Sequence, residues 1–242
     1  MAEPHVEVAP SGTAVAGRWW SGPGILGGVA CALMAVALYL VFLWVPNERT
    51  MGWPSRIFYF HVASAWNAFL AFFVVFLASV AYLWRRRPEL DTVAAASAEV
   101  GVLFTTIVLT TGPLWARPVW GVWWTWDPRL TTTLVLWFLY LGYLVLRQAV
   151  EDDERRARFS AVYGIVAFLD VPVVFESVRW WRTIHPQVLA PGDIRIAPEM
   201  LLTLLVSVAA FTALYAYLLR LSVGVNRLQR ELERVKARLR GA

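Results

Sequence analysis

The sequence has one cysteine, few charged residues and three histidines, and these scarcities exclude several kinds of protein. Cys31 has no partner for a disulfide within the chain, and no C-x-x-C-H motif is present, so the chain is not itself a c-type cytochrome. Charged residues make up 16% of the chain, whereas soluble domains carry about 25%. No G-x-x-x-x-G-K-[ST] loop is present to hold nucleotide phosphates, so any use of ATP belongs to a partner.

What the sequence has in excess is apolar residues, which make up 59% of the chain. They are gathered into runs of about 17–25 residues, long enough to cross a hydrocarbon core of about 30 Å. Each run should be a helix, because lipid offers no hydrogen-bond partners to the backbone. We therefore predict an all-α integral membrane protein whose residues 23–221 form one membrane domain. The six expected transmembrane helices are Ile25–Val45, Ile57–Trp84, Val93–Thr111, Leu130–Leu146, Ala161–Glu176 and Pro198–Leu221.

Basic residues between the spans predict the orientation. Fifteen of the 22 Lys and Arg residues lie in the connections and tails on one side of the predicted spans. Most of these are in residues 85–87, 147–158 and 220–240. The positive-inside rule then places both termini, including a tail of residues 1–22, in the cytoplasm. The outer (periplasmic) segments of this cytoplasmic (inner) membrane protein would be Pro46–Arg56, Gly112–Arg129 and Ser177–Ala197.

Residues 222–242 are expected to form a cytoplasmic amphipathic helix after the last span. Apolar residues recur there at spacings of four and three, as in a coiled-coil seam, and the other residues are mostly Arg and Glu. Two interpretations remain open, a basic helix on anionic lipid and a coiled-coil contact with a partner. The seam residues are Leu221, Val225, Leu228, Leu232, Val235 and Leu239.

Two acidic residues lie within the fifth span, where a charge is a functional candidate by default. We expect Asp170 to hydrogen-bond between helices beside a kink at Pro172. Glu176 should lie nearer the outer surface, paired with Arg179 or Arg182.

The outer segment 112–129 is unusually rich in tryptophan. An aromatic belt at the membrane surface needs only one or two Trp at a helix end, so a platform for a ligand or partner is the alternative that we favour. Asp127 followed by Pro128 is also a typical helix start, with Asp as N-cap and Pro as first residue. We expect Trp120, Trp123 and Trp124 to share one face of a short helical turn. The five tryptophans are Trp115, Trp120, Trp123, Trp124 and Trp126.

Two histidines lie on the same predicted side of the membrane as these tryptophans. His61 is about one turn inside the outer end of the second span, and His185 is in the third outer segment. A single histidine at a helix end is more often a structural hydrogen bonder, but two that flank an aromatic platform favour a ligand site. The third, His5, is in the N-terminal tail.

Haem is the ligand that would use both features. Its iron takes axial imidazoles from opposite faces of the ring, and aromatic side chains can cover its large apolar macrocycle. A metal ion alone does not need a tryptophan platform. Arg56 and Arg129, beside the histidine span and the tryptophan segment, are candidates for binding the propionates.

These residues resemble a known family. The run from Trp120 to Thr131, with Trp123-Trp124-Thr125-Trp126-Asp127-Pro128 at its centre, is similar to the WWD motif of the haem-handling proteins of cytochrome c biogenesis. In size and number of spans the chain is most similar to haem exporter protein C (CcmC) of that family. The resemblance covers residues 25–221 and includes further segments in the same order, among them Ile57–His61, Ser64–Trp66, Thr105-Thr106 with Gly112, Phe138–Tyr143, Trp180-Trp181, and Thr183 with His185.

The resemblance implies a function in haem delivery. His61 and His185 would be the axial ligands of haem b, and the tryptophan segment with Asp127 would contact the haem and the haem chaperone CcmE. CcmA and CcmB would drive release, and the small membrane subunit CcmD would join the complex. We therefore expect a binding and delivery protein and not an enzyme. The alternatives are a haem lyase that attaches haem to apocytochrome c, and a structural subunit that only docks partners. Longer relatives with the same motif are lyases, but they carry extra histidines within their spans, where this chain has only His61.

Overall fold

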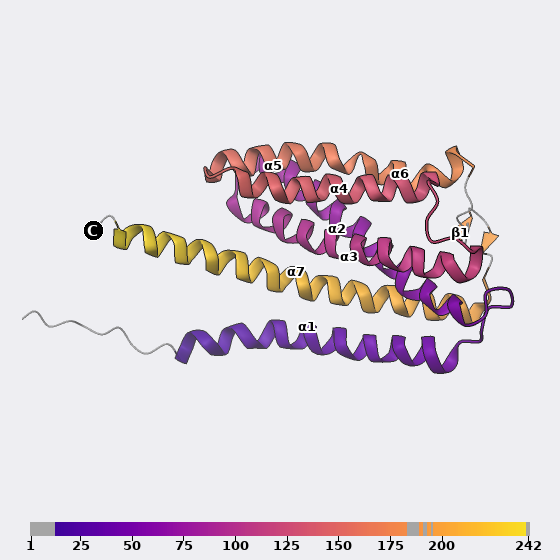
Figure 1. The fold of residues 1–242 in the computed structure, drawn as a ribbon. Helices are drawn as coiled ribbons and strands as arrows, with labels where there is room; N and C mark the ends of the chain where they lie inside the picture. The colour runs from indigo at the N-terminus through magenta and orange to yellow at the C-terminus, as the bar shows by residue number, and fades with distance from the viewer. Residues whose placement is uncertain (1–12, 183–188, 191–192, 195, 241–242) are drawn as a thin grey trace, which may run out of the picture.

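Each apolar run forms a helix in the computed structural model, which describes residues 13–182, 189–190, 193–194 and 196–240 (Figure 1). The two β-strands of this described part are two residues long and pair antiparallel. The elements in order are α1 (Thr13–Tyr39), η1 (Leu40–Trp44), η2 (Trp53–Arg56), α2 (Ile57–Arg85), α3 (Pro88–Trp120), α4 (Pro128–Ala149), α5 (Asp153–Phe168), α6 (Asp170–Trp180), β1 (Leu189–Ala190), β2 (Asp193–Ile194) and α7 (Pro198–Arg240).

Six helices of this described part are long and apolar enough to cross a membrane. This confirms the six predicted spans and makes the chain a multi-pass membrane protein. The first span combines the end of α1 with η1, the second joins η2 to α2, and the fifth combines α5 and α6. The helices run beyond the predicted limits: α1 begins at Thr13, inside the predicted tail 1–22, and α3 begins at Pro88.

The fifth span is broken where the sequence predicted a kink. Leu169 separates α5 from α6, and its amide bonds to the carbonyl of Val166 at 3.1 Å instead of continuing the α-helical pattern. Pro172 contributes to the break because it has no N–H for the carbonyl one turn earlier. Near the other end of α6, Glu176 pairs with Arg179 at 2.7 Å, one of the two expected partners.

The helix bundle has two distinct ends (Figure 1). We call the end with the α3–α4 connection, residues 121–127, the tryptophan end. We call the opposite end the basic end, because Arg86 and Arg87 connect α2 to α3 there and the α4–α5 connection lies beside them. The tryptophan end carries the candidate site.

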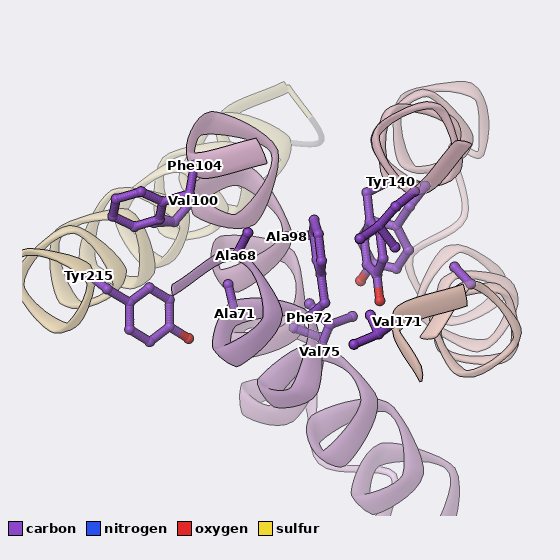
Figure 2. Packing of buried hydrophobic residues seen from close by; sticks show 14 of the residues in the cluster. Ala68, Ala71, Phe72, Val75, Ala98, Val100, Phe104, Tyr140, Val171 and Tyr215 are labelled. Atoms are coloured by element: carbon purple, nitrogen blue, oxygen red, sulfur yellow. The ribbon is translucent and has the colours of Figure 1, made fainter. Parts of the chain in front are cut away.

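α2 lies at the centre of the bundle and packs against α3, α5 and α7. Small residues allow these helices to approach closely, as expected where hydrophobic burial does not drive helix association. Figure 2 shows Ala71 and Phe72 of α2 between Tyr215 on one side and Tyr140 on the other. Phe72 stacks on Tyr140 with ring centroids 3.6 Å apart, and both side chains are fully buried. This packing fixes the position of α2, and therefore of His61.

The C-terminal segment 222–240 is not a separate helix. α7 continues without a break over 43 residues, which at about 1.5 Å per residue exceeds twice the thickness of a hydrocarbon core. The predicted seam residues from Leu221 to Leu239 are exposed along it. Because α7 does not bend away from its spanning half, its C-terminal half projects from the basic end (Figure 1).

The close packing of α2 and α3 gives a first prediction. A methyl group built on Gly101 of α3 would lie 2.5 Å from the ring of Phe72, which Tyr140 prevents from moving away. Gly101→Ala should therefore destabilise the protein by about 1–3 kcal/mol, the usual effect of overpacking. Thermal unfolding in detergent measures this.

Gly28→Ala is the matched control, because nothing lies within 4 Å of a methyl group at Gly28. It should be neutral or slightly stabilising, since Ala favours helix over Gly. Equal unfolding temperatures for the two variants would contradict the packing described here.

Candidate functional site

A pocket opens at the tryptophan end between α2, α3, α4 and α6. Its volume is about 120 Å³, smaller than the roughly 300–1,000 Å³ of typical pockets for ligands of drug size. Its walls are mainly apolar, and its polar residues are few. The lining comprises His61, Val62, Ala65, Ala68, Phe69, Thr105, Val108, Leu109, Gly112, Pro113, Trp115, Ala116, Trp120, Trp124, Arg129, Leu130, Thr133, Leu136 and Val174.

His61 lies in the wall of this pocket, in the second turn of α2. Its Nδ1 is 3.0 Å from the hydroxyl oxygen of Thr111 on α3. The hydroxyl of Thr111 donates to the carbonyl oxygen of Ile107 at 2.7 Å, which leaves its oxygen to accept from His61. This arrangement favours the tautomer with the imidazole proton on Nδ1. This is the tautomer that a metal-ligating histidine adopts when its other nitrogen is hydrogen-bonded.

Thr111 and Gly112 were not predicted as site residues, although Gly112 belongs to the segments that carry the family resemblance. A Cβ at Gly112 would lie 3.6 Å from Cε1 of His61, so glycine leaves the pocket open beside the imidazole. In the sequence, Thr111 directly precedes Gly112 near the end of an apolar span, and this pattern could have indicated its role.

The five tryptophans do not form one shelf. Helix α3 runs on to Trp120 and α4 begins at Pro128, so only residues 121–127 of the predicted loop 112–129 are non-helical. The expected helical turn with Trp120, Trp123 and Trp124 on one face is therefore wrong. Gly121 ends α3 in the left-handed conformation, with φ of 76°, and so redirects the chain.

Three of the tryptophans line the pocket. Trp115 is buried, and its ring centroid lies 5.9 Å from that of His61. Trp120 continues this aromatic wall at 6.1 Å from Trp115, and Trp124 lines the pocket from the α3–α4 connection. These indoles and the imidazole form an apolar surface suited to a flat ligand.

The other two tryptophans point outward. Trp123 is 57% exposed and Trp126 is 75% exposed. Arg117 lies over the ring of Trp123, with its guanidinium carbon 6.0 Å from the centroid. Trp126 packs edge-on against Trp124, which connects the exposed rim to the pocket wall. Exposed indoles on one side of a pocket are typical of a contact surface.

Asp127 caps α4, as its position before Pro128 predicted. Its carboxylate accepts from the amide of Arg129 at 3.0 Å, and its carbonyl accepts from the amide of Thr131 at 2.9 Å. The residue is buried. This position suits a role in fixing the start of α4 and the end of the tryptophan connection.

The two candidate arginines lie in different places. Arg129 lines the pocket, and its guanidinium also reaches the carbonyl oxygen of Phe175 on α6 at 3.4 Å. Arg56 is buried outside the pocket lining, 4.3 Å from the centroid of Trp53 and 3.5 Å from the carbonyl oxygen of Val45. The structure therefore brings only Arg129 together with His61.

His185 lies outside the described residues, so its expected place opposite His61 stays a prediction. Trp180 and Trp181, near the last described residue before it, are exposed at the tryptophan end.

The fold and this pocket together define a polytopic membrane protein with a tryptophan-lined pocket at one end of its helix bundle and an imidazole in the wall of that pocket. The model of the family described as CcmC, Heme exporter protein C, matches residues 12–238. The chain therefore belongs to the haem exporter protein C family, which implies a role in haem delivery for cytochrome c biogenesis.

Individual relatives agree with this assignment. Heme exporter protein C of Bradyrhizobium diazoefficiens is 38% identical over 80% of this chain and 74% of its own length. Heme exporter protein C of Haemophilus influenzae is 32% identical over 84% of this chain and 83% of its own length. A ccmC-like mitochondrial protein of cytochrome c biosynthesis from Marchantia polymorpha is 33% identical over 77% of this chain and 80% of its own length.

The hydrogen bond from His61 to Thr111 gives a second prediction. Thr111→Val should lower the affinity for haem by roughly 10–100-fold, the usual effect of losing a group that orients a metal-ligating histidine. Titration of the detergent-purified protein with haem, followed by absorption, measures this.

Thr110→Val is the matched control. Thr110 also donates to a carbonyl one turn earlier, at 2.7 Å, but it is exposed and does not line the pocket. If both valine variants bound haem as the wild type does, Thr111 would have no role in orienting His61.

Proposed function

We propose that the pocket binds haem b, with His61 as one axial ligand and His185 as the other, and presents it to the haem chaperone CcmE. The observation that carries this proposal is the position of His61 in the wall of a tryptophan-lined pocket, with its Nδ1 3.0 Å from the hydroxyl oxygen of Thr111. The site thus offers an imidazole for iron and an aromatic surface for the macrocycle, the two features that haem needs.

The remaining lining residues suit the rest of the haem molecule. Trp115, Trp120 and Trp124 would contact the apolar macrocycle. Arg129 would bind a propionate, because a guanidinium forms charge-assisted hydrogen bonds to a carboxylate. Arg56, packed on Trp53 outside the pocket, is less suited to that role.

The small size of the pocket supports delivery instead of permanent storage. A volume of about 120 Å³ holds only part of a large cofactor. Haem bound to His61 would therefore extend past the rim, where Trp123 and Trp126 are exposed. An accessible haem edge beside exposed indoles is the arrangement that transfer to a chaperone requires.

The distribution of basic residues supports an outward-facing site in the cytoplasmic membrane. Fifteen of the 22 Lys and Arg residues fall in flanks at the basic end, which the positive-inside rule places in the cytoplasm. The tryptophan end would then face the periplasm, where the chaperone would approach it. CcmA and CcmB would drive release with the energy of ATP hydrolysis, and CcmD would be a further membrane partner.

The axial assignment is tested by the absorption spectrum of the purified protein. We expect a Soret band and sharp reduced α and β bands in the wild type, and their loss in His61→Ala and in His185→Ala. His5→Ala, which changes a histidine of the N-terminal tail, should leave the spectrum unchanged. Normal haem content in both ligand variants would exclude these two histidines as axial ligands.

Because some tryptophans line the pocket and others are exposed, we predict that their substitution affects haem binding and haem transfer separately. Trp123→Ala/Trp126→Ala should keep haem bound but reduce its transfer to CcmE by about tenfold, the usual scale of losing a well-packed aromatic contact. Trp120→Ala/Trp124→Ala should lower haem occupancy itself. Haem content and haem transfer to purified chaperone are measured in parallel.

Trp66→Ala is the control, because Trp66 is equally exposed on α2 but lies outside the pocket lining. Identical behaviour of the two double variants would argue against a division between pocket and rim. Covalent attachment of haem to apocytochrome c without CcmE would point to a lyase instead.

A further inference from the structure

A second cavity lies at the basic end, remote from the haem-handling pocket. It has a volume of about 540 Å³ and is bounded by the end of α2, the beginnings of α3 and α5, and the projecting half of α7. Four arginines and three carboxylates provide its charge. Its lining comprises Tyr82, Arg86, Pro88, Asp91, Asp153, Glu154, Arg156, Ala157, Arg158 and Arg230.

The carboxylates of this cavity are already engaged. Asp91 receives two hydrogen bonds from Arg147, at 2.5 and 2.9 Å, and a third from Arg230 at 3.2 Å. The side chains of Asp91, Arg147 and Arg230 are 8%, 12% and 28% exposed. Two guanidinium groups thus share one carboxylate of this cavity, and Glu99 and Glu233 line an adjoining cavity together with Arg147 and Arg230.

The other two carboxylates of the lining are paired as well. Asp153 pairs with Arg156, and Glu154 pairs with Arg158 at 2.7 Å. Arg86 stands beside Tyr82, with its guanidinium carbon 5.9 Å from the ring centroid. The lining has four arginines and three carboxylates, so it carries one positive charge in excess.

Arg86 also occupies a backbone position where arginine is unusual. It ends α2 in the left-handed conformation, with φ of 53°, and is the one non-glycine residue of the described chain with a positive φ. Glycine or asparagine is the usual residue at such a helix end. The backbone of Arg86 therefore adopts a conformation that is unfavourable for arginine. Its side chain lines the cavity.

The location of the cavity indicates an amphipathic ligand. It lies where α2 ends at Arg85 and α3 begins at Pro88, at the limit of two membrane spans. Its inner wall includes Tyr82 and Ala157, which belong to an apolar cluster beneath it. Arginines above an apolar wall at this depth match a phosphate attached to acyl chains.

We propose that this cavity binds the phosphate group of an anionic phospholipid through Arg86 and Arg158, with Arg230 beside them. Arginine favours phosphate because its planar donors match the phosphate oxygens. The same arginines would also accept free phosphate, so the two sources must be separated by experiment.

The test uses the full-length protein, depleted of lipid in detergent and mixed with phosphatidylglycerol or phosphatidylcholine, with bound lipid counted by native mass spectrometry. We expect phosphatidylglycerol to bind about tenfold more tightly than phosphatidylcholine, and Arg86→Gln/Arg158→Gln to lose about tenfold of that affinity. If Arg86→Gln lowers the unfolding temperature, Arg86→Gly, which suits the left-handed conformation, replaces it.

Arg85→Gln/Arg87→Gln is the matched control. It removes the same charge from adjacent, exposed residues that do not line the cavity, so it should change the affinity by less than about twofold. Equal losses in the two double variants, or no preference for phosphatidylglycerol, would overturn the lipid site.

Inorganic phosphate alone, titrated by calorimetry, separates the two sources. Phosphate binding that requires Arg86 and Arg158, without a preference for phosphatidylglycerol, would assign the cavity to a soluble anion instead of a lipid. No binding of either probe would overturn the phosphate site altogether.

Discussion

The hydrocarbon core offers no hydrogen-bond partners to the backbone, and the architecture of this protein follows from that constraint. Each apolar run is a helix, and the non-helical connection 121–127 lies at the end of the bundle. The break between α5 and α6 in the fifth span, at Leu169, is a single residue that bonds locally to Val166. Ligand-binding loops can therefore form only at the two ends, and the tryptophan pocket and the arginine cavity lie at opposite ends.

Helix packing within this constraint determines the chemistry of the pocket. Fully buried contacts such as the stack of Phe72 on Tyr140 hold α2 against α4, and Gly101 lets α3 approach α2 closely. The same α2–α3 contact, followed toward the tryptophan end, places Thr111 beside His61. A threonine whose hydroxyl bonds to its own helix then favours the imidazole tautomer with the proton on Nδ1. Packing in the apolar core thus influences a buried imidazole in the wall of the pocket.

The site residues were predictable to different degrees. His61 and the tryptophans were recognisable because histidine is rare in this chain and indole is concentrated in one segment. The N-cap role of Asp127 was also predictable, because capping is a local interaction between neighbouring residues. Thr111 was not predicted, because its role depends on a contact with a residue 50 positions away. Arg56 and Arg129 looked equivalent in sequence, but only Arg129 lines the pocket.

The six spans, the break near Pro172, the helix start at Asp127 and the resemblance to the haem exporter family could be derived from the sequence alone. These depend on run length, local backbone chemistry and motif order, which are properties of neighbouring residues. The three-dimensional arrangement was needed to show that α3 continues to Trp120, that three tryptophans line a pocket while two face outward, and that one carboxylate serves both Arg147 and Arg230. These depend on distances between helices, which side-chain volume and packing decide across the whole bundle.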